Sequence, residues 1–245
     1  MAKKSGLGQG FFIGGKDISG DVSSVDTVAS PKEVLDVTGI DKSAVERIAG
    51  RGSGEISFTT FFNDAANQQH AALKAVARTD VVGCYFQSST LGETAAGIVA
   101  KQMSYDTTRG TDGSLTNSVQ LLANSNVLEW GNTVTAGKIT HSSAGSSTGA
   151  VTASSAAGGA AYIQIFSLDS GTPTFVVQDS SDTSNGTDGS WATLLTFATQ
   201  AVGAERKTVS GTVNKGLRIT TTGTFSNAVI AVMLRRGESV DAEGY

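Results

Sequence analysis

The residues best suited to nucleophilic chemistry lie in a tract rich in serine and glycine. Gly145-Ser-Ser-Thr-Gly149 matches the G-x-S-x-G pattern of serine hydrolases, and His141 precedes it closely. That pattern is catalytic only on a sharp turn from a strand into a helix, with a histidine and an acid beside the serine. No helical pattern follows this tract, and tracts of small residues match the pattern by chance. The sequence therefore predicts no nucleophile at Ser147.

An acidic loop over residues 179–189 is the next candidate, as a calcium site. An EF-hand loop needs ligands at alternate positions and a bidentate Glu at position twelve. Here Asp179, Asp182 and Asn185 are three residues apart, and position twelve is Ser190. We expect a solvated hairpin loop instead. With two histidines and one cysteine, the chain has too few ligands for a zinc cluster, and we expect no metal or cofactor.

Two further residues with reactive side chains are predicted to be structural. His70 falls between Ala66 and Leu73 on one side of an expected helix, so we expect it to be hydrogen-bonded at a helix–sheet or subunit boundary. Cys84, the only cysteine, stands in the strand-like run Val81-Val-Gly-Cys-Tyr-Phe-Gln87 and is expected to be a small buried residue. The chain is therefore predicted not to be an enzyme.

Alternation of apolar and polar residues predicts a mainly β protein. The run 55–62 places its apolar residues on one strand face, because side chains of a strand repeat at every second position. One helix is expected over residues 65–78, capped by Asn63 or Asp64, because this stretch contains no Gly or Pro. This helix is predicted to cover one sheet.

The stretch 26–54 supports two interpretations. Ser30-Pro-Lys-Glu33 has the capping box and proline of a helix start. Val34–Thr38 favours a strand, because β-branched residues lose rotamer freedom in a helix. We favour the strand, and expect a single helical turn over residues 43–49 that ends at Gly50.

The composition changes near Gly137. Acidic and basic residues are mixed up to residue 136, whereas no Lys or Arg occurs between Lys138 and Arg206. We therefore predict two domains, 1–136 and 137–245, of which the second is an antiparallel β-sandwich of seven or eight short strands. The net charge of −4 gives no general attraction to nucleic acid or anionic membrane. No apolar run is long enough for a membrane span, and the N-terminus lacks the pattern of a signal peptide, so we expect synthesis in a cytoplasm.

The order of motifs in the first domain resembles the major tail tube proteins of long-tailed bacteriophages. The resemblance covers roughly residues 8–131. It depends on several short motifs and on their spacing around the single helix: Asp17-Ile-Ser-Gly-Asp-Val22, Leu35-Asp-Val-Thr-Gly39, Glu46-Arg-Ile48, Gly54-Glu-Ile-Ser-Phe58 leading to Phe61-Phe-Asn63, and Val99-Ala-Lys-Gln-Met103.

This resemblance implies a β-sandwich or barrel flanked by one helix, in a virion protein that self-assembles. Subunits of this family form hexameric rings that stack into a hollow tube through which DNA passes without specific binding. The implied partners are other copies of the chain and the tape measure, terminator and distal tail proteins. The N-terminal arm, 1–10, and the loop 26–54 would reach neighbouring subunits.

Candidate assembly residues follow from the same resemblance. Leu35, Val37, Ile40 and Ile48 are expected to be buried between subunits, with burial inside their own subunit as the alternative. A channel for DNA should be acidic or neutral, because Lys and Arg supply most non-specific affinity for phosphates. The candidates for the channel lining are Asp106, Asp112 and Glu129, which could equally be ordinary exterior turn residues.

The second domain resembles the immunoglobulin-like or carbohydrate-binding-like sandwiches that some tail tube proteins carry outside the tube. Trp191 is its candidate for a glycan contact, with packing in the core as the alternative. Two other functions remain open on the sequence. One is a carbohydrate-binding module protein, and the other is a different virion protein, such as a capsid decoration or tail terminator protein.

Overall fold

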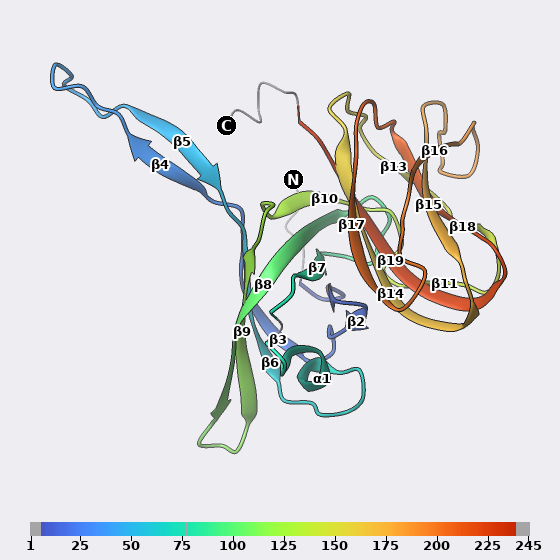
Figure 1. Ribbon diagram of the computed structural model, residues 1–245, viewed down its shortest axis with the longest axis horizontal. Helices are drawn as coiled ribbons and strands as arrows, with labels where there is room; N and C mark the ends of the chain where they lie inside the picture. Colours follow the sequence, from blue (N-terminus) through green and yellow to red (C-terminus); the bar gives the residue numbers. More distant parts are fainter. Residues whose placement is uncertain (1–5, 77, 239–245) are drawn as a thin grey trace.

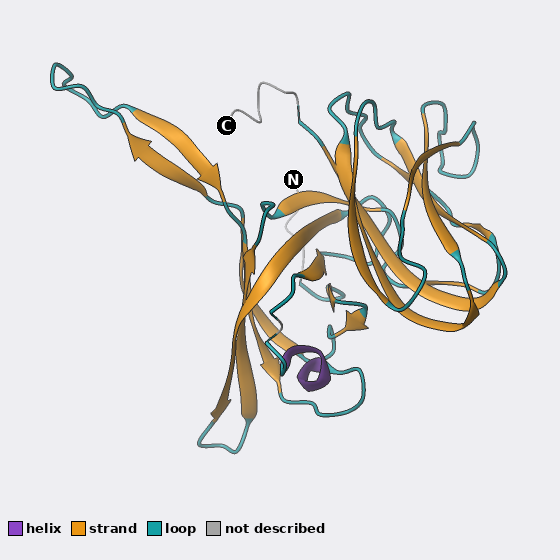
Figure 2. Cartoon of the chain, viewed as in Figure 1, coloured by secondary structure: helices purple, strands orange, loops and turns teal. Residues whose placement is uncertain are grey.

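The structure is a computed structural model that describes residues 6–76 and 78–238. The prediction of a mainly β protein with one helix is confirmed, with several antiparallel sheets and no closed barrel in this part of the chain (Figures 1 and 2). Of the predicted N-terminal arm, residues 1–5 lie outside the described residues.

Two sheets that share one long strand build the first half of the molecule. The shared strand is β8, which pairs with β7 up to Ala100 and with β9 from Ala100 onward. The sheets enclose an apolar core that includes Phe11, Ile56 and Phe58. The strands of this half are β1 (Gly10–Ile13), β2 (Lys16–Asp17), β3 (Val22–Ala29), β6 (Glu55–Phe61), β7 (Val81–Phe86), β8 (Thr94–Arg109), β9 (Leu115–Ala123) and β10 (Glu129–Thr133).

The helix is much shorter than predicted. Among the described residues only Gln69–Leu73 is helical, as α1, although the expected helix covered residues 65–78, of which residue 77 lies outside the described residues. Asn67 has a φ of 65°, which Asn tolerates better than most residues, and the helix begins only after it. The proposed caps are also wrong, since the N-cap is Gln68 and it makes no side-chain capping bond. Asn63 instead accepts a hydrogen bond from the Ala65 N–H.

Residues 32–52 form a hairpin that stands apart from the two sheets that share β8, and we call this hairpin the arm. Its strands are β4 (Lys32–Asp36) and β5 (Arg47–Gly52), which pair only with each other (Figure 1). The preference for a strand over Val34–Thr38 is confirmed for residues 34–36, since β4 ends at Asp36. The helical turn predicted over residues 43–49 is wrong, because residues 47–49 pair with β4.

The second half is an antiparallel sandwich, as predicted. Its two layers enclose a core that includes Ile163, Phe175 and Ile219. One layer contains β11 (Ile139–His141), β14 (Gly159–Gly171), β17 (Gly203–Val209) and β19 (Phe225–Arg236). The other contains β12 (Gly145–Ser146), β13 (Ala150–Val151), β15 (Thr174–Ser180), β16 (Ala192–Thr196) and β18 (Gly216–Thr222).

One continuous sheet joins the two halves. β10 pairs with β8 on one side and with β19 on the other, so the sheet crosses the predicted domain boundary. A third apolar cluster lies at this junction and draws on both halves, with Phe12 and Phe86 from one and Tyr162 and Met233 from the other. Whether 1–136 and 137–245 are separate folding units stays a prediction.

Candidate assembly surfaces

The arm carries the four predicted assembly residues, and all four are exposed. Leu35 and Ile48 lie opposite each other on β4 and β5, so their side chains share one face of the hairpin. They are 41% and 53% exposed, Val37 is 47% exposed, and Ile40 at the tip is fully exposed. Burial within their own subunit, the alternative, does not occur in the described residues. Burial between subunits stays a prediction.

Two further apolar residues of the arm were missed by the sequence analysis. Val34 and Val45 are 64% and 54% exposed. Val34 lies opposite Ala49, on the face of the hairpin away from Leu35. An interpretation of residues 32–52 as a hairpin would have identified both residues. The predicted helical turn over residues 43–49 obscured the extended, alternating pattern of side chains in this stretch.

Local hydrogen bonds order the tip of the arm without help from the body of the protein. Asp36 accepts hydrogen bonds from the N–H and the hydroxyl of Thr38, at 2.9 and 2.6 Å. The Thr38 hydroxyl oxygen accepts one from the Glu46 N–H at 2.9 Å, and Lys42 forms an ion pair with Glu46. These bonds close the loop between β4 and β5. The arm therefore presents its apolar side chains in a defined shape.

A polar surface covers the outer side of the sheet β3-β6-β9-β8. Residues directly opposite each other across antiparallel strands form rows whose side chains share one face of the sheet. The rows on one face contain Ile56, Phe58 and Val119, which are buried in the core. The rows between them point the other way and form what we call the outer face. Its residues, all half-buried or exposed, are Ser24, Thr27 and Ala29; Glu55, Ser57, Thr59 and Phe61; Thr116, Ser118, Gln120 and Leu122; and Lys101, Ser104, Asp106 and Thr108.

Hydroxyl and acidic groups dominate this outer face. Asp26, in a bulge of β3, accepts hydrogen bonds from Ser24 and Thr59. Glu55 accepts one from the Gln120 amide at 2.8 Å. The single lysine, Lys101, forms an ion pair with Asp80 at 2.8 Å. The face therefore carries more negative than positive charge.

Both edges of this sheet are unpaired within the described chain. β3 pairs only with β6. β8 pairs with β9 along one side, whereas the other side has no strand beyond Ala100, where the pairing with β7 ends. Unpaired edges present rows of backbone N–H and C=O groups to which another chain can add a strand.

The three channel candidates lie in three different settings. Asp106 is exposed and belongs to the outer face. Asp112 lies in the turn between β8 and β9, where hydrogen bonds from the backbone and hydroxyl of Ser114 hold its pKa below the usual value. Glu129 is only 5% exposed and is wrongly placed among them, because a buried carboxylate cannot present its charge to a channel.

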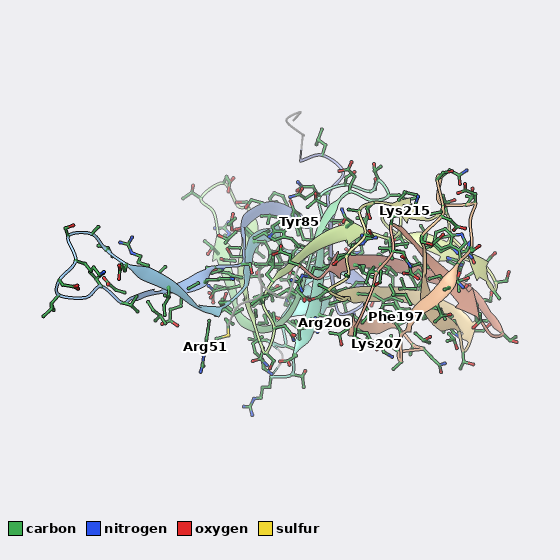
Figure 3. All side chains as sticks on the ribbon, turned by 90° about the horizontal axis from the view of Figure 1, so that it is seen from above. Arg51, Tyr85, Phe197, Arg206, Lys207 and Lys215 are labelled. Carbon is green, nitrogen blue, oxygen red and sulfur yellow. The ribbon has the colours of Figure 1, made fainter. Side chains whose placement is uncertain are left out.

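Glu129 instead forms a buried ionic cluster between the two halves. The guanidinium of Arg206 binds both of its carboxylate oxygens, at 2.7 and 2.8 Å. The Tyr162 hydroxyl donates a hydrogen bond to Oε2, and Arg235 lies 3.8 Å from Oε1. Burial, followed by the Glu129 charge, raises the pKa of Tyr162, so the phenol stays protonated as a donor. Figure 3 shows Arg206 near the middle of the molecule, far from Arg51 on the arm.

The side chain of Trp191 is engaged by its own domain. The Arg218 guanidinium lies over the indole at 4.3 Å from the ring centroid, and the indole N–H donates to the Asp188 carbonyl at 3.0 Å. The ring edge abuts Gly149, where an added Cβ would lie 2.7 Å from it. Trp191 is half-buried, and its role as a glycan contact stays a prediction.

The residues weighed for catalysis and metal binding have structural partners. Ser147 donates its hydroxyl to the Ile219 carbonyl, and His141 contacts Thr221, where burial lowers the histidine pKa. Asp188 accepts hydrogen bonds from Thr183 and Ser184, which hold its pKa far below the usual range. In residues 6–76 and 78–238, no group of three His, Cys, Asp or Glu residues is arranged to hold a metal ion.

The predictions for His70 and Cys84 are confirmed. His70 Nδ1 lies 2.8 Å from the Tyr105 hydroxyl, which joins α1 to β8 at a helix–sheet boundary. Cys84 is buried at the junction of the halves, and burial raises the pKa of its thiol to about 12. No described helix is long and apolar enough to span a membrane.

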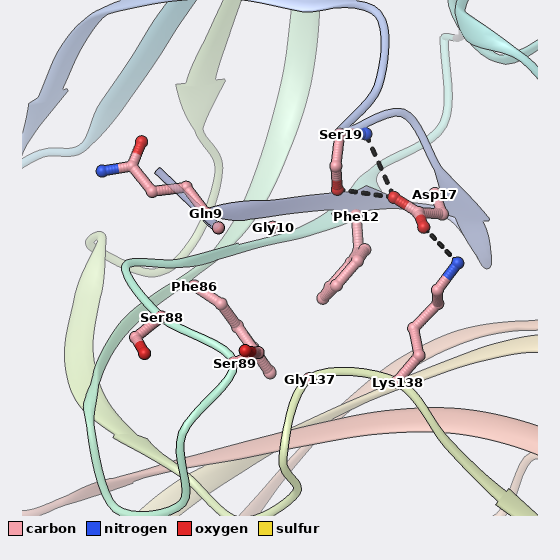
Figure 4. Close-up of a pocket in the computed structure, with 11 residues that line it drawn as sticks. Gln9, Gly10, Phe12, Asp17, Ser19, Phe86, Ser88, Ser89, Gly137 and Lys138 are labelled. Carbon is pink, nitrogen blue, oxygen red and sulfur yellow. Dashed lines mark hydrogen bonds and ion pairs between the residues drawn. The ribbon is translucent and has the colours of Figure 1, made fainter. Parts of the chain in front are cut away.

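A small cleft lies beside the junction of the two halves (Figure 4). Its volume is about 210 Å³, and Phe12 and Phe86 form part of its lining. Lys138 forms an ion pair with Asp17 at its rim. Burial raises the pKa of Asp17, but the hydrogen bonds from Lys138 and Ser19 outweigh burial and hold it below the usual value. The cleft holds no arrangement of groups typical of catalysis.

No protein-family model matches the sequence, and no curated protein matches it. Among solved structures, the chain is similar to the SPP1 Dit protein, described as a paradigm of hub adsorption apparatus in Gram-positive infecting phages. That match has a TM-score of 0.33 and 9% identity, over 94% of this chain and 99% of the other. A chain of the phage P2 baseplate in its activated conformation with Ca gives a TM-score of 0.32 and 9% identity, over 94% and 99%. TM-scores of this size do not establish a shared fold.

Proposed function

We propose that this protein is a structural subunit of a phage tail tube, whose copies form hexameric rings that stack around a channel for DNA. The observation that carries the proposal is the arm, whose apolar side chains have no core of their own to enter. A two-stranded hairpin is at best marginally stable in water. The arm is therefore suited to contacts with another copy of the chain.

The open edges of the sheet β3-β6-β9-β8 support ring formation. Each adjacent pair of strands is antiparallel and the sheet has four strands, so β3 and β8 run in opposite directions. A β3 strand of one copy can thus pair with β8 of the next and continue the antiparallel sheet. Such a contact joins two different surfaces, and contacts of that kind close into a ring when the rotation between copies permits.

The outer face supports a role as the channel lining. When the four-stranded sheets of several copies join edge to edge, each sheet turns one face inward. The opposite face covers the apolar core of each subunit, so the outer face is the one available for the channel. Its excess of acidic residues, Asp106 among them, would repel DNA phosphates and let DNA slide. Asp112, in the adjoining turn, would lie at one mouth of the channel.

The position of the second half and the partners of the protein follow from this role. The sandwich of the second half would lie outside the tube, because the sheet that joins it to the first half continues from β8 through β10 and away from β9. Tape measure, terminator and distal tail proteins would be the partners at the inside and the ends of the tube. The virion tail would be the site of action.

Negative-stain electron microscopy of the purified, concentrated protein tests the proposal. We expect hollow tubes or stacked rings with six-fold symmetry and a bore wide enough for duplex DNA. A variant with Val202→Ser, which alters an exposed apolar residue between β16 and β17 of the second half, serves as the control and should assemble normally. Closed rings that never stack at any concentration would support a terminator or capsid decoration protein instead. A protein that stays monomeric and binds glycans only when Trp191 is intact would support the carbohydrate-binding alternative.

A further inference from the structure

Two exposed apolar patches lie at opposite ends of the same sheet. The arm leaves β3 after Ala29 and returns at Glu55, and these two residues pair at one end of β3 and β6. At the other end of β6, Phe61 pairs with Thr116, and the Phe62 N–H bonds the Leu115 carbonyl at 2.9 Å. Phe61 and Leu115 are 54% and 36% exposed, and alternation along the strands places them on opposite faces of the sheet at this end. Figure 1 shows the arm and the β8–β9 turn pointing away from opposite ends of this sheet.

The alternation of β6 explains why Phe61 is exposed. Ile56, Phe58 and Thr60 face the core, so Phe61 has the opposite orientation and lies on the outer face. It is the one aromatic residue in a face otherwise filled mainly by hydroxyl, amide and charged groups. A large apolar residue at the end of a polar surface is typical of a contact with another chain.

The arm is also long enough for an end-to-end contact. From Ser30 to Ile40 the chain can extend about 35 Å, at roughly 3.3 Å per residue, whereas the seven-residue β6 extends about 23 Å. An arm of this length can cross the boundary between two copies and still overlap the end of the next sheet.

We infer that the arm of one copy docks on the Phe61–Leu115 end of a second copy of this chain, which is displaced along the direction of the strands. The inference rests on the proposed function, since it assigns the contact that stacks one ring on the next. Leu35, Val37, Ile40 and Ile48 supply the apolar side of the arm, and Phe61 is its main target. Because the two surfaces differ, the contact is heterologous and repeats without limit along the axis.

Complementation of two defective variants tests this arrangement. One variant, Leu35→Ser with Ile48→Ser, has a polar arm and an intact target; the other, Phe61→Ser, has an intact arm and a polar target. Neither should form tubes alone, whereas ring formation should persist because the open strand edges are unchanged. Mixed in equal amounts, they should form pairs of rings that grow no further, because each pair ends in one defective arm and one defective target. Tubes formed by Phe61→Ser alone, or a mixture that yields only single rings, would overturn the inference.

Cysteine cross-linking tests the contact even where no tube forms. Cys84 is buried with a thiol pKa of about 12, so it does not compete with introduced cysteines. Protein with Ile40→Cys should form disulfides with protein carrying Phe61→Cys several-fold more readily than either forms with itself. A preference of Ile40→Cys for its own kind would overturn the inference by showing an arm-to-arm contact. Cross-linking without any ring would leave this contact established and would count against the tail tube proposal alone.

Discussion

The single carboxylate of Glu129 holds together groups that belong to four strands. Its partners Arg206, Tyr162 and Arg235 come from β17, β14 and β19, whereas Glu129 itself begins β10. Removing one member of a buried ion pair leaves the other charge without compensation, which costs about 3–5 kcal/mol. We therefore expect Glu129→Gln to lower the free energy of unfolding by about 3 kcal/mol, near the lower limit because the amide can still accept a hydrogen bond.

Urea denaturation of the two proteins measures this difference. The matched control is Lys42→Ala, which removes the exposed ion pair with Glu46 on the arm and should change the free energy of unfolding by less than about 1 kcal/mol. An effect of Glu129→Gln no larger than that of the control would show that the buried cluster contributes little to stability.

Cys84 makes the stability of the protein sensitive to alkaline pH. Burial raises its thiol pKa from 9.0 to about 12, so above pH 9 the unfolded chain releases a proton that the folded protein keeps. The stabilising contribution is complete below pH 9 and is lost as the pH rises toward 12, by about 1.4 kcal/mol per pH unit.

A Cys84→Ala variant isolates this contribution. At pH 8 it should differ from the unmodified protein only through lost packing, and the free energies of unfolding should converge by about 1 kcal/mol as the pH rises from 9 to 10. Parallel pH dependences of the two proteins would show that the thiol ionises equally in both states.

At the scale of single elements, the arm is separable from the fold that carries it. None of its exposed apolar residues belongs to a buried cluster, and the sheet below it closes through the pairing of Ala29 with Glu55. We expect replacement of residues 31–52 by a short Gly/Ser loop to leave the circular dichroism spectrum of the β-sheets intact and to abolish tube formation. Loss of folding, seen as a lost cooperative thermal transition, would show that the arm stabilises the subunit.

The elements also show which features a sequence reveals. Strand alternation over residues 55–62 is a local signal and identified β6 correctly. The helix was overestimated because the Ala-rich stretch has good helix propensity throughout, whereas Asn67 adopts a left-handed conformation and Gln69 is held by Asp21 and Tyr105. Tertiary contacts of this kind override propensity. The role of Glu129 could not be predicted, because its partner Arg206 is far away in the chain and nothing in their local sequences signals the pairing.

The change of composition near Gly137 carried no information about how the two halves are joined. Gln164 of β14 accepts a hydrogen bond from the Gly15 N–H at 2.7 Å and donates to the Val82 carbonyl at 2.9 Å. Together with the shared sheet and the Glu129 cluster, these bonds tie the sandwich to β7 and to the β1–β2 turn.

At the scale of the whole molecule, we therefore expect the two halves to unfold together. Differential scanning calorimetry of the full chain should give one transition whose calorimetric and van't Hoff enthalpies agree. In Glu129→Gln that transition should move to a lower temperature and remain single. Two resolved transitions in the unmodified protein would show instead that 1–136 and 137–245 are independent folding units.

The arm also has a consequence for the timing of assembly. Docking the arm against a partner fixes its exposed side chains, at an entropic cost of about 0.5–1 kcal/mol for each Leu or Ile. Two free subunits meet that cost through a single contact, whereas the end of a tube presents a complete circle of targets. Growth would then be nucleated, with a lag that a preformed seed removes, and free subunits would remain in solution until such a seed determines where a tube begins.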